Sequence, residues 1–423
     1  MASPTAQPGP IAPQAPLPPP PPPPAAAQPG PIAPQEPPPP PPPALSDDIL
    51  REIFIRLPCP ADLARAAISC ASFRCVITEP SFIRRFRALN PQPLLGVLDH
   101  NGDFFPAEPP HPSAPAARTV ARGIDFSCTF LPTPHLWRRR DVRDGRFLLS
   151  RFEQSPGNSV FMELAVCDPL SRRYVLLPPV PDDLATSAQM QNLVDLRPFF
   201  APAGDDEADT SFRVIYMVRC VAKLAVFTFS SDAEQWNVLA YHGWAGLVAG
   251  TPTWSTALSE RHYVHGCICW FLRWNQKLLL LDTHRMEFSI INLPSSDLAE
   301  MEQIAIVEQP EGRLGLFIFM DELLNRKFDI CYMVWQNNAE GLNQWSLERL
   351  MRLPSNYRYN YVGSTGGYLL VQGVPEVTPA TDHAYFSVDL KTFKVERFCE
   401  TKHPLIGTNL FAGFPPSLTP PSI

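Results

Sequence analysis

The sequence predicts a multidomain protein in which a disordered proline-rich tail precedes a small all-α module and an all-β domain, a six-bladed β-propeller. Residues 1–44 hold 22 prolines and a single charged side chain, Glu36, a composition typical of a disordered tail. Residues 45–90 carry apolar side chains at helical spacing. From residue 91 to residue 423, short apolar or alternating runs are broken by Gly, Pro, Asp and Asn, as expected for strands and turns.

The composition is that of a globular protein, with 45% hydrophobic and 18% charged residues among 423. A net charge of -7 argues against a general phosphate-binding surface, and we expect no nucleic-acid partner. No apolar run approaches the roughly 20 residues of a membrane helix, so we expect no membrane association. Ten cysteines without a Cys-x-x-Cys pair, and no signal-peptide pattern, indicate a protein of the cytoplasm, the nucleus or both.

The tail contains one nonapeptide twice, AQPGPIAPQ at 6–14 and at 27–35, and each copy leads into a run of seven prolines. Proline fixes φ and lacks a backbone N–H, so we expect an extended, solvated polyproline II segment. It serves as a spacer or, alternatively, as a docking tract for aromatic grooves of the SH3, WW or profilin type.

The helical module begins where the prolines stop. Ser46 is a suitable N-cap, Asp47 and Asp48 place negative charge in the first turn, and Pro58 and Pro60 end the helix. Its apolar positions form one broad stripe, made of Leu45, Ile49, Leu50, Ile53, Phe54 and Leu57. Three more short helices follow, with apolar side chains in 63–70, 73–77 and 82–86. Four short helices make a marginal core, so we expect a partner to cover part of this surface.

This segment resembles the F-box, over about a tenth of the chain. The matching residues are Leu45, Asp48-Ile49-Leu50, Glu52-Ile53-Phe54, Arg56-Leu57-Pro58, Leu63-Ala64-Arg65, Ser69-Cys70, Arg74, Ile77 and Pro80-Ser81-Phe82. Two positions depart from the family pattern, since Ser46 replaces the usual proline and Phe73 stands where tryptophan is common.

The resemblance implies that the module binds the small Skp adaptor of cullin–RING ubiquitin ligases. The residues that it assigns to this contact are Leu45, Ile49, Leu50, Ile53, Phe54, Leu57, Pro58, Leu63, Cys70, Phe73, Pro80 and Phe82. We expect Leu45, Leu50, Pro58 and Phe82 to lie at the interface, whereas Ile53, Leu63 and Ile68 are equally explained as the module's own core.

The all-β region contains two recurring patterns. A glycine opens an apolar strand at Gly145, Gly266, Gly312 and Gly367, and a hairpin follows about 16 to 25 residues later. Three hairpins are alike, because Asp168, Asp282 and Asp389 each precede by six positions an aromatic or apolar residue, namely Tyr174, Phe288 and Val395. Looser copies surround Asp99, Asp232 and Asn337.

The six hairpins are spaced by 69, 64, 50, 55 and 52 residues. Such spacing is that of four-stranded propeller blades, which repeat at about 50 residues in the kelch type. One blade cannot bury its faces alone, whereas a closed ring of blades can. The phrase from Asp168 to Pro179, DPLSRRYVLLPP, resembles the F-box-associated, kelch-like propellers common in plant F-box proteins. Six blades is our count, with seven blades or a β-sandwich as alternatives.

Several segments carry groups capable of chemistry. His262, His265, Cys267 and Cys269 resemble a metal cluster, but a regular strand cannot hold them at tetrahedral zinc distances, so we expect no metal and no cofactor. The glycines at 363–367 lack the lysine of a phosphate loop. The acidic residues within 205–209 are interpreted as a solvated loop.

Two surfaces of the all-β region are candidates for partner contacts. Basic residues cluster next to Trp137, namely Arg138, Arg139, Arg140, Arg143 and Arg146. We interpret this cluster as a charged loop or an inter-blade contact rather than as a site for an acidic peptide or nucleic acid. Tyr241, Trp244 and Trp254 lie on a linker between blades and are either anchors for a target protein or plugs over the blade junction.

The resemblance and the residues together predict a non-catalytic substrate receptor of a Skp–cullin–F-box ubiquitin ligase, with the propeller binding an unidentified target protein. Its contribution to the reaction is proximity, because it holds a target lysine near the conjugating enzyme. The alternative is a propeller scaffold without a ligase role, whose helices serve only its own stability. No hydrolase or nucleotide motif favours an enzyme.

Overall fold

The computed structural model describes the chain from residue 45 to residue 413 with gaps. The described ranges are 45–57, 60–90, 92–151, 160–188, 192–202, 211–221, 223–241, 244–247, 260–272, 276–293, 303–309, 312–319, 330–337, 343–354, 357–365, 367–375 and 382–413. The tail, Pro58, Trp254 and the acidic stretch at 205–209 therefore lie outside the described residues.

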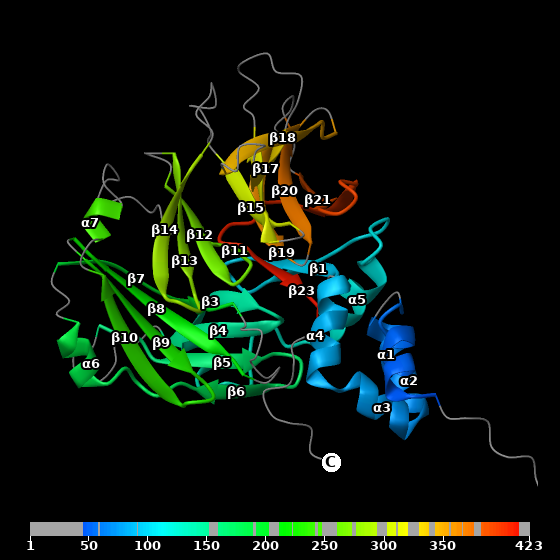
Figure 1. Ribbon diagram of the computed structural model, residues 1–423, viewed down its shortest axis with the longest axis horizontal. Coiled ribbons are helices and arrows are strands. Elements are labelled where there is room, and N and C mark those ends of the chain that lie inside the picture. Colours follow the sequence, from blue (N-terminus) through cyan, green and yellow to red (C-terminus); the bar gives the residue numbers. More distant parts are fainter. Residues whose placement is uncertain are drawn as a thin grey trace, which may run out of the picture.

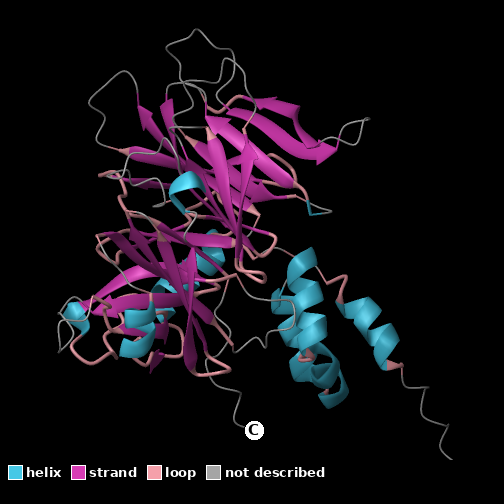
Figure 2. Cartoon of the chain, turned by 60° about the vertical axis from the view of Figure 1, so that its left-hand side comes forward, coloured by secondary structure: helices cyan, strands magenta, loops and turns pink. Residues whose placement is uncertain are grey.

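The helical module consists of α1 (Asp47–Phe54), α2 (Pro60–Ser69), α3 (Ala71–Ile77) and α4 (Pro80–Leu89). Ser46 caps α1, because its side-chain oxygen accepts a hydrogen bond from the Ile49 N–H at 3.5 Å. The four helices enclose a core made of Leu50, Phe54, Ile55, Leu63, Val76, Ile77, Phe82 and Phe86. They lie together beside the strands and not among them (Figures 1 and 2).

The remaining described residues form a six-bladed β-propeller, as the hairpin spacing predicts. Five blades have four antiparallel strands each. The strands of blades 2 and 3 are β3 (Trp137–Arg143), β4 (Arg146–Arg151), β5 (Leu164–Asp168) and β6 (Arg173–Leu176), then β7 (Leu193–Phe200), β8 (Arg213–Cys220), β9 (Leu224–Ser230) and β10 (Gln235–Tyr241).

Blades 4 to 6 continue in the same order along the chain. Blade 4 comprises β11 (His262–Val264), β12 (Cys267–Leu272), β13 (Lys277–Asp282) and β14 (Glu287–Asn292). Blade 5 comprises β15 (Ile304–Glu308), β16 (Leu314–Phe319), β17 (Ile330–Asn337) and β18 (Asn343–Met351). Blade 6 comprises β19 (Tyr357–Thr365), β20 (Tyr368–Pro375), β21 (His383–Asp389) and β22 (Val395–Thr401).

Blade 1 closes the ring by combining both ends of the propeller sequence. Its order is β2 (Phe104–Pro106), β1 (Leu94–Leu98) and β23 (Asn409–Ala412), so the last strand pairs with the first. Leu94 lies opposite Ala412 and Leu98 lies opposite Asn409. This pairing joins the first and last strands of the propeller sequence within one blade and so closes the ring.

The recurring glycines and aspartates occupy equivalent turns. Each of the four glycines precedes the second strand of its blade and has a positive φ, between 72° and 81°. Asp389 Oδ1 accepts hydrogen bonds from the N–H groups of Lys391 and Thr392, and four residues after the aspartate Phe393 has a φ of 58°. Asp168 and Asp282 accept equivalent pairs of bonds. The shared pattern is thus an aspartate-capped turn followed by one left-handed residue.

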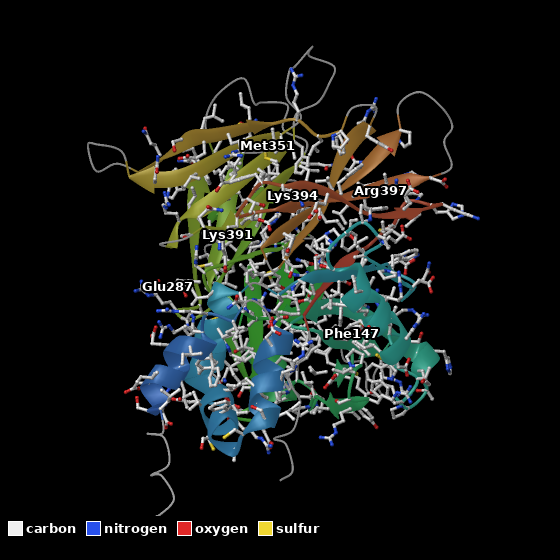
Figure 3. All side chains as sticks on the ribbon, turned by 90° about the vertical axis from the view of Figure 1, so that its right-hand side faces the viewer. Phe147, Glu287, Met351, Lys391, Lys394 and Arg397 are labelled. Atoms are coloured by element: carbon white, nitrogen blue, oxygen red, sulfur yellow. The ribbon has the colours of Figure 1, made fainter. Side chains whose placement is uncertain are left out.

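Apolar side chains fill the space between neighbouring blades. Separate clusters lie between blades 2 and 3, 3 and 4, 4 and 5, and 5 and 6, and one larger cluster joins blades 6, 1 and 2. Phe147, in the larger cluster, is fully buried, and Figure 3 shows side chains packed throughout this interior. Each blade therefore depends on its neighbours for its core.

One helix of the propeller region was not expected from the sequence. The helix α5 (Ala114–Gly123) has ten residues and packs against β1 and β2, with Ala117 and Val120 buried. Its buried side chains are small, which weakens the periodic apolar signal. Shorter helical segments are η1 (Pro134–Leu136), α6 (Asp182–Ser187) and α7 (Trp244–Leu247).

Candidate docking surfaces

One face of α1 is apolar and exposed. Ile49 and Ile53 are spaced by four residues on one side of α1 and are 49% and 45% exposed, and Leu45, just before the N-cap Ser46, is 53% exposed. Arg51 and Glu79, joined at 2.8 Å, and Glu52 and Arg85, at 3.6 Å, tie α1 to the segments that follow. The exposed stripe is thus held in place by the rest of the module while remaining uncovered.

The structure divides the residues that the F-box resemblance assigns to adaptor binding. Leu50 and Phe82, expected at the interface, are only 4% exposed and belong to the module's core. Ile53 and Ile68, for which a core role was open, are exposed instead. The helical period places 49 and 53 beside 50 and 54 in one broad stripe, and only the packing of the other helices decides which edge is buried.

The other assigned residues support the module's structure. Phe54 and Leu63 are buried, and Leu57 is half-buried against the core. Phe73 packs edge-to-face on Phe54 with ring centroids 5.1 Å apart. Cys70 is the N-cap residue of α3, and hydrogen bonds from the backbone N–H groups of Phe73 and Ser72 lower the pKa of its thiol. Pro80 is the first residue of α4.

Covering the exposed stripe would yield substantial free energy. Complete burial of a leucine or isoleucine side chain contributes about 1.5–3 kcal/mol. Since the three side chains of the stripe are already about half buried, a partner that covers them gains about 2–4 kcal/mol from this contact. That is enough to anchor an interface but too little to be its whole affinity.

The aromatic linker between blades 3 and 4 fills a junction. Trp244 is 2% exposed and packs on Phe288 with ring centroids 5.6 Å apart. Tyr241 also stacks edge-to-face on Phe288, at 4.8 Å, and its hydroxyl donates to the Met286 carbonyl. Both rings therefore act as plugs, the second of the two expectations, and Trp244 offers no surface on which a target protein could bind.

A buried polar network links blades 2, 3 and 4. Asp141 on β3 accepts hydrogen bonds from the Phe200 N–H at 2.8 Å and the Tyr263 hydroxyl at 3.0 Å, and forms an ion pair with Arg261 at 3.3 Å. Burial alone would lower the pKa of Arg261, but the Asp141 carboxylate raises it. Burial and the same carboxylate raise the pKa of Tyr263. The network therefore keeps a charged pair inside the propeller.

A second buried network links blades 4, 5 and 6. His262 Nδ1 accepts from the Ile306 N–H and lies 3.3 Å from the Tyr361 hydroxyl. Gln303 accepts from the Tyr361 N–H at 2.5 Å and donates to Asn360. Burial lowers the pKa of His262 to about 4, so the ring is neutral at physiological pH and acts as an acceptor.

The basic cluster at β3 and β4 serves two purposes. Arg139 donates to Asn409 of blade 1, Arg143 lies 4.3 Å over the Tyr263 ring, and Arg146 donates to the Ser211 carbonyl of blade 3. These three arginines therefore form the inter-blade contacts that the sequence analysis favoured. Arg138 and Arg140 remain exposed on β3.

The structure brings two further arginines to this region. Arg197 on β7 and Arg219 on β8 lie in the adjacent blade; the charge of Arg197 interacts with that of Arg140, and the charge of Arg219 interacts with those of Asp195 and Arg197. Sequence reasoning missed both, because each is a single cation within an alternating strand. The only available signal was the strand-like pattern of the segments RVIYMVRC and LVDLRPFF, which contain these two arginines.

Two further questions concern metals and membranes. Within the described ranges, no three His, Cys, Asp or Glu side chains are grouped so that they could hold a metal ion. His262 and His265 are engaged in hydrogen bonds to other blade residues. None of the described helices is long and apolar enough to cross a bilayer.

Comparisons with known proteins show only distant likenesses. No family model and no curated protein matches the chain. Among solved structures, a sialidase from Streptococcus pneumoniae is 12% identical with a TM-score of 0.30, over 56% of this chain and 35% of the sialidase. A putative 6-phosphogluconolactonase from Bacteroides uniformis is 11% identical with a TM-score of 0.28, over 63% and 85% of the two chains.

Prolyl oligopeptidase B from Galerina marginata is 12% identical with a TM-score of 0.27, over 73% of this chain and 47% of that one. This chain therefore spans about a third of the sialidase and about half of the peptidase. Likenesses at this level say nothing about activity, so a function has to be inferred from the surfaces of this chain.

Proposed function

We propose that the protein is the substrate-recognition subunit of a Skp–cullin–F-box ubiquitin ligase in the cytoplasm or nucleus. The helical module binds a Skp adaptor, and the propeller, of the kelch-like class found in plant F-box proteins, binds the target protein. The protein supplies no catalytic residue and accelerates ubiquitin transfer by holding the target near the conjugating enzyme.

The exposed stripe of Leu45, Ile49 and Ile53 is the observation that carries this proposal. It coincides with the first part of the F-box pattern, and exposed apolar side chains in register on one helix are typical of a helix-packing interface. Among the described residues, the module's core shares no member with the propeller clusters. The helices therefore do not form part of the propeller's interior, which favours a docking role over a purely stabilising one.

Co-expression of the full chain with a Skp adaptor tests the proposal. We expect the two proteins to co-purify. The double variant Ile49→Asp, Ile53→Asp should bind the adaptor at least about 100-fold more weakly, because two charges would be buried against the adaptor. Leu50→Asp is unsuitable, since Leu50 is buried and its replacement would unfold the module.

Leu239→Asp is the matched control. Leu239 is 46% exposed, like the two isoleucines, but it lies on β10 at the outer edge of blade 3. It should leave adaptor binding unchanged. The proposal fails if the wild-type chain does not co-purify with the adaptor, or if the double variant binds as well as Leu239→Asp.

A further inference from the structure

Four arginines gather where blades 2 and 3 meet near the centre of the propeller. Arg138 and Arg140 lie on β3, Arg197 lies on β7, and Arg219 lies on β8 opposite Asp195. The strands β3 and β7 are the first strands of adjacent blades, and each lies next to the ring's centre. Arg138 and Arg140 are exposed, whereas Arg197 and Arg219 are half-buried. Guanidinium groups from two blades thus share one surface.

The backbone is irregular at this surface. The pairing of β3 with β4 shifts between Arg139 and Asp141, so Arg140 is the extra residue of a β-bulge. The pairing of β7 with β8 shifts between Leu193 and Asp195. Bulges redirect side chains and are frequent beside binding sites. Without the bulge, strand alternation would aim Arg140 to the face opposite that of Arg139 and Asp141.

Arg140 has no carboxylate partner among the described residues. Its Nε donates to Ser150 Oγ at 2.6 Å, and an Nη lies 3.4 Å from Met162 Sδ. Although the residue as a whole is exposed, partial desolvation of its guanidinium lowers the pKa of Arg140, and the charges of Arg197 and Arg138 lower it further. The described acids nearby are Asp195, bound to Arg197 at 2.6 Å, and Glu163, which pairs with Arg151 at 3.2 Å. Among the residues that the structure describes, the Arg140 charge therefore has no carboxylate counterion.

This arginine surface faces away from the end of the propeller at which the helical module joins. Arg139 donates to Asn409, so the first residues of β3 lie beside the first residue of β23. The entry strand β1 begins at Leu94, opposite Ala412 at the other end of β23. The module joins near Leu94, and the arginines thus lie at the opposite end of the strands.

We propose that Arg140 and Arg197, flanked by Arg138 and Arg219, bind the oxyanions of an acidic segment in a protein partner. Arginine binds carboxylate and phosphate in a planar, bidentate manner, and a row of guanidinium groups matches acids along an extended peptide. A nucleic-acid duplex is disfavoured, because the cluster is small, Asp195 lies within it and the chain is acidic overall. The identification of this partner as a ubiquitination target rests on the proposed function.

Fluorescence anisotropy with the full chain tests this site. The probes are a labelled peptide of six glutamates, the same peptide with glutamines, a phosphoserine peptide and a duplex oligonucleotide, each at low and high salt. We expect the glutamate or the phosphoserine peptide to bind and the glutamine peptide not to bind, with affinity falling as salt rises. The peptide that binds more tightly shows whether the site prefers carboxylate or phosphate oxygens.

The double variant Arg140→Gln, Arg197→Gln should weaken anionic-peptide binding at least about tenfold, because it removes two charged hydrogen-bond donors to the oxyanions. The matched control is Arg118→Gln, Arg122→Gln, which removes two exposed arginines from α5. An equal loss in both variants, binding of neither anionic peptide, or tighter binding of the duplex through the same arginines would overturn the proposal. Adaptor co-purification measured in parallel separates its failure from failure of the proposed function, because the arginine variant should keep the adaptor.

Discussion

The buried ion pair between Asp141 and Arg261 offers the sharpest test of how the propeller is held together. The side chains are 6% and 13% exposed and lie 3.3 Å apart, on strands 120 residues distant in sequence. With an effective dielectric constant of about 20, Coulomb's law gives about 5 kcal/mol for such a pair. Removing one partner of a buried pair costs about 3–5 kcal/mol, because the other charge stays buried alone.

We therefore expect Asp141→Asn to lower the free energy of unfolding by about 3–5 kcal/mol. The asparagine oxygen can still accept from the Phe200 N–H, so the loss reports mainly the charge. The assay is denaturant unfolding followed by tryptophan fluorescence, in a cycle with Arg261→Gln and the double variant. The double variant should recover about 1–3 kcal/mol relative to additivity. A single variant within about 1 kcal/mol of wild type, or a strictly additive cycle, would refute the reasoning.

Two further predictions concern buried side chains between blades. Burial lowers the pKa of His262 to about 4, whereas the pKa is about 6.5 in the unfolded chain. The contribution of the neutral His262 ring to the free energy of unfolding is therefore fully present above pH ~6.5 and declines by about 3 kcal/mol as the pH falls to ~4. His262→Asn should remove this part of the pH dependence of the unfolding free energy, and a parallel dependence in both proteins would contradict it. Trp244→Ala should cost about 3–5 kcal/mol by leaving a cavity beside Phe288, measured as a lower denaturant midpoint; a loss below about 1 kcal/mol would show that the ring is not a plug.

The blade count follows from the sequence because its signals are local. The turn aspartates and left-handed glycines need only their own few residues to specify a hairpin, so Asp282 and Gly266 can be recognised without knowing the fold. Their spacing then gives the blades. By contrast, Asp141 meets Arg261 only when the ring closes, and no pattern within either strand foretells that contact.

The helical module shows the same limit on a smaller scale. Periodicity correctly places Ile49, Leu50 and Ile53 on the apolar side of α1, yet neighbouring positions are separated by about 100° around the axis. Whether Ile49 or Leu50 enters the core depends on where α3 and α4 pack. Leu50 and Phe82, which we expected at the interface, lie in the module's core, and the binding of an adaptor to the exposed side stays a prediction.

Residues 261–263, at the start of blade 4, connect the two buried networks. Arg261 and Tyr263 reach Asp141 and Phe200 in blades 2 and 3, whereas His262, between them, faces Ile306 and Tyr361 in blades 5 and 6. Alternation of side chains along an extended segment makes this possible, since successive residues point to opposite sides. Five of the six blades are thus tied through three consecutive residues. Blade 1 is tied separately, by the pairing of β1 with β23 and by Arg139. On the proposed function, a ring tied together in this way holds the target at a set distance from the adaptor.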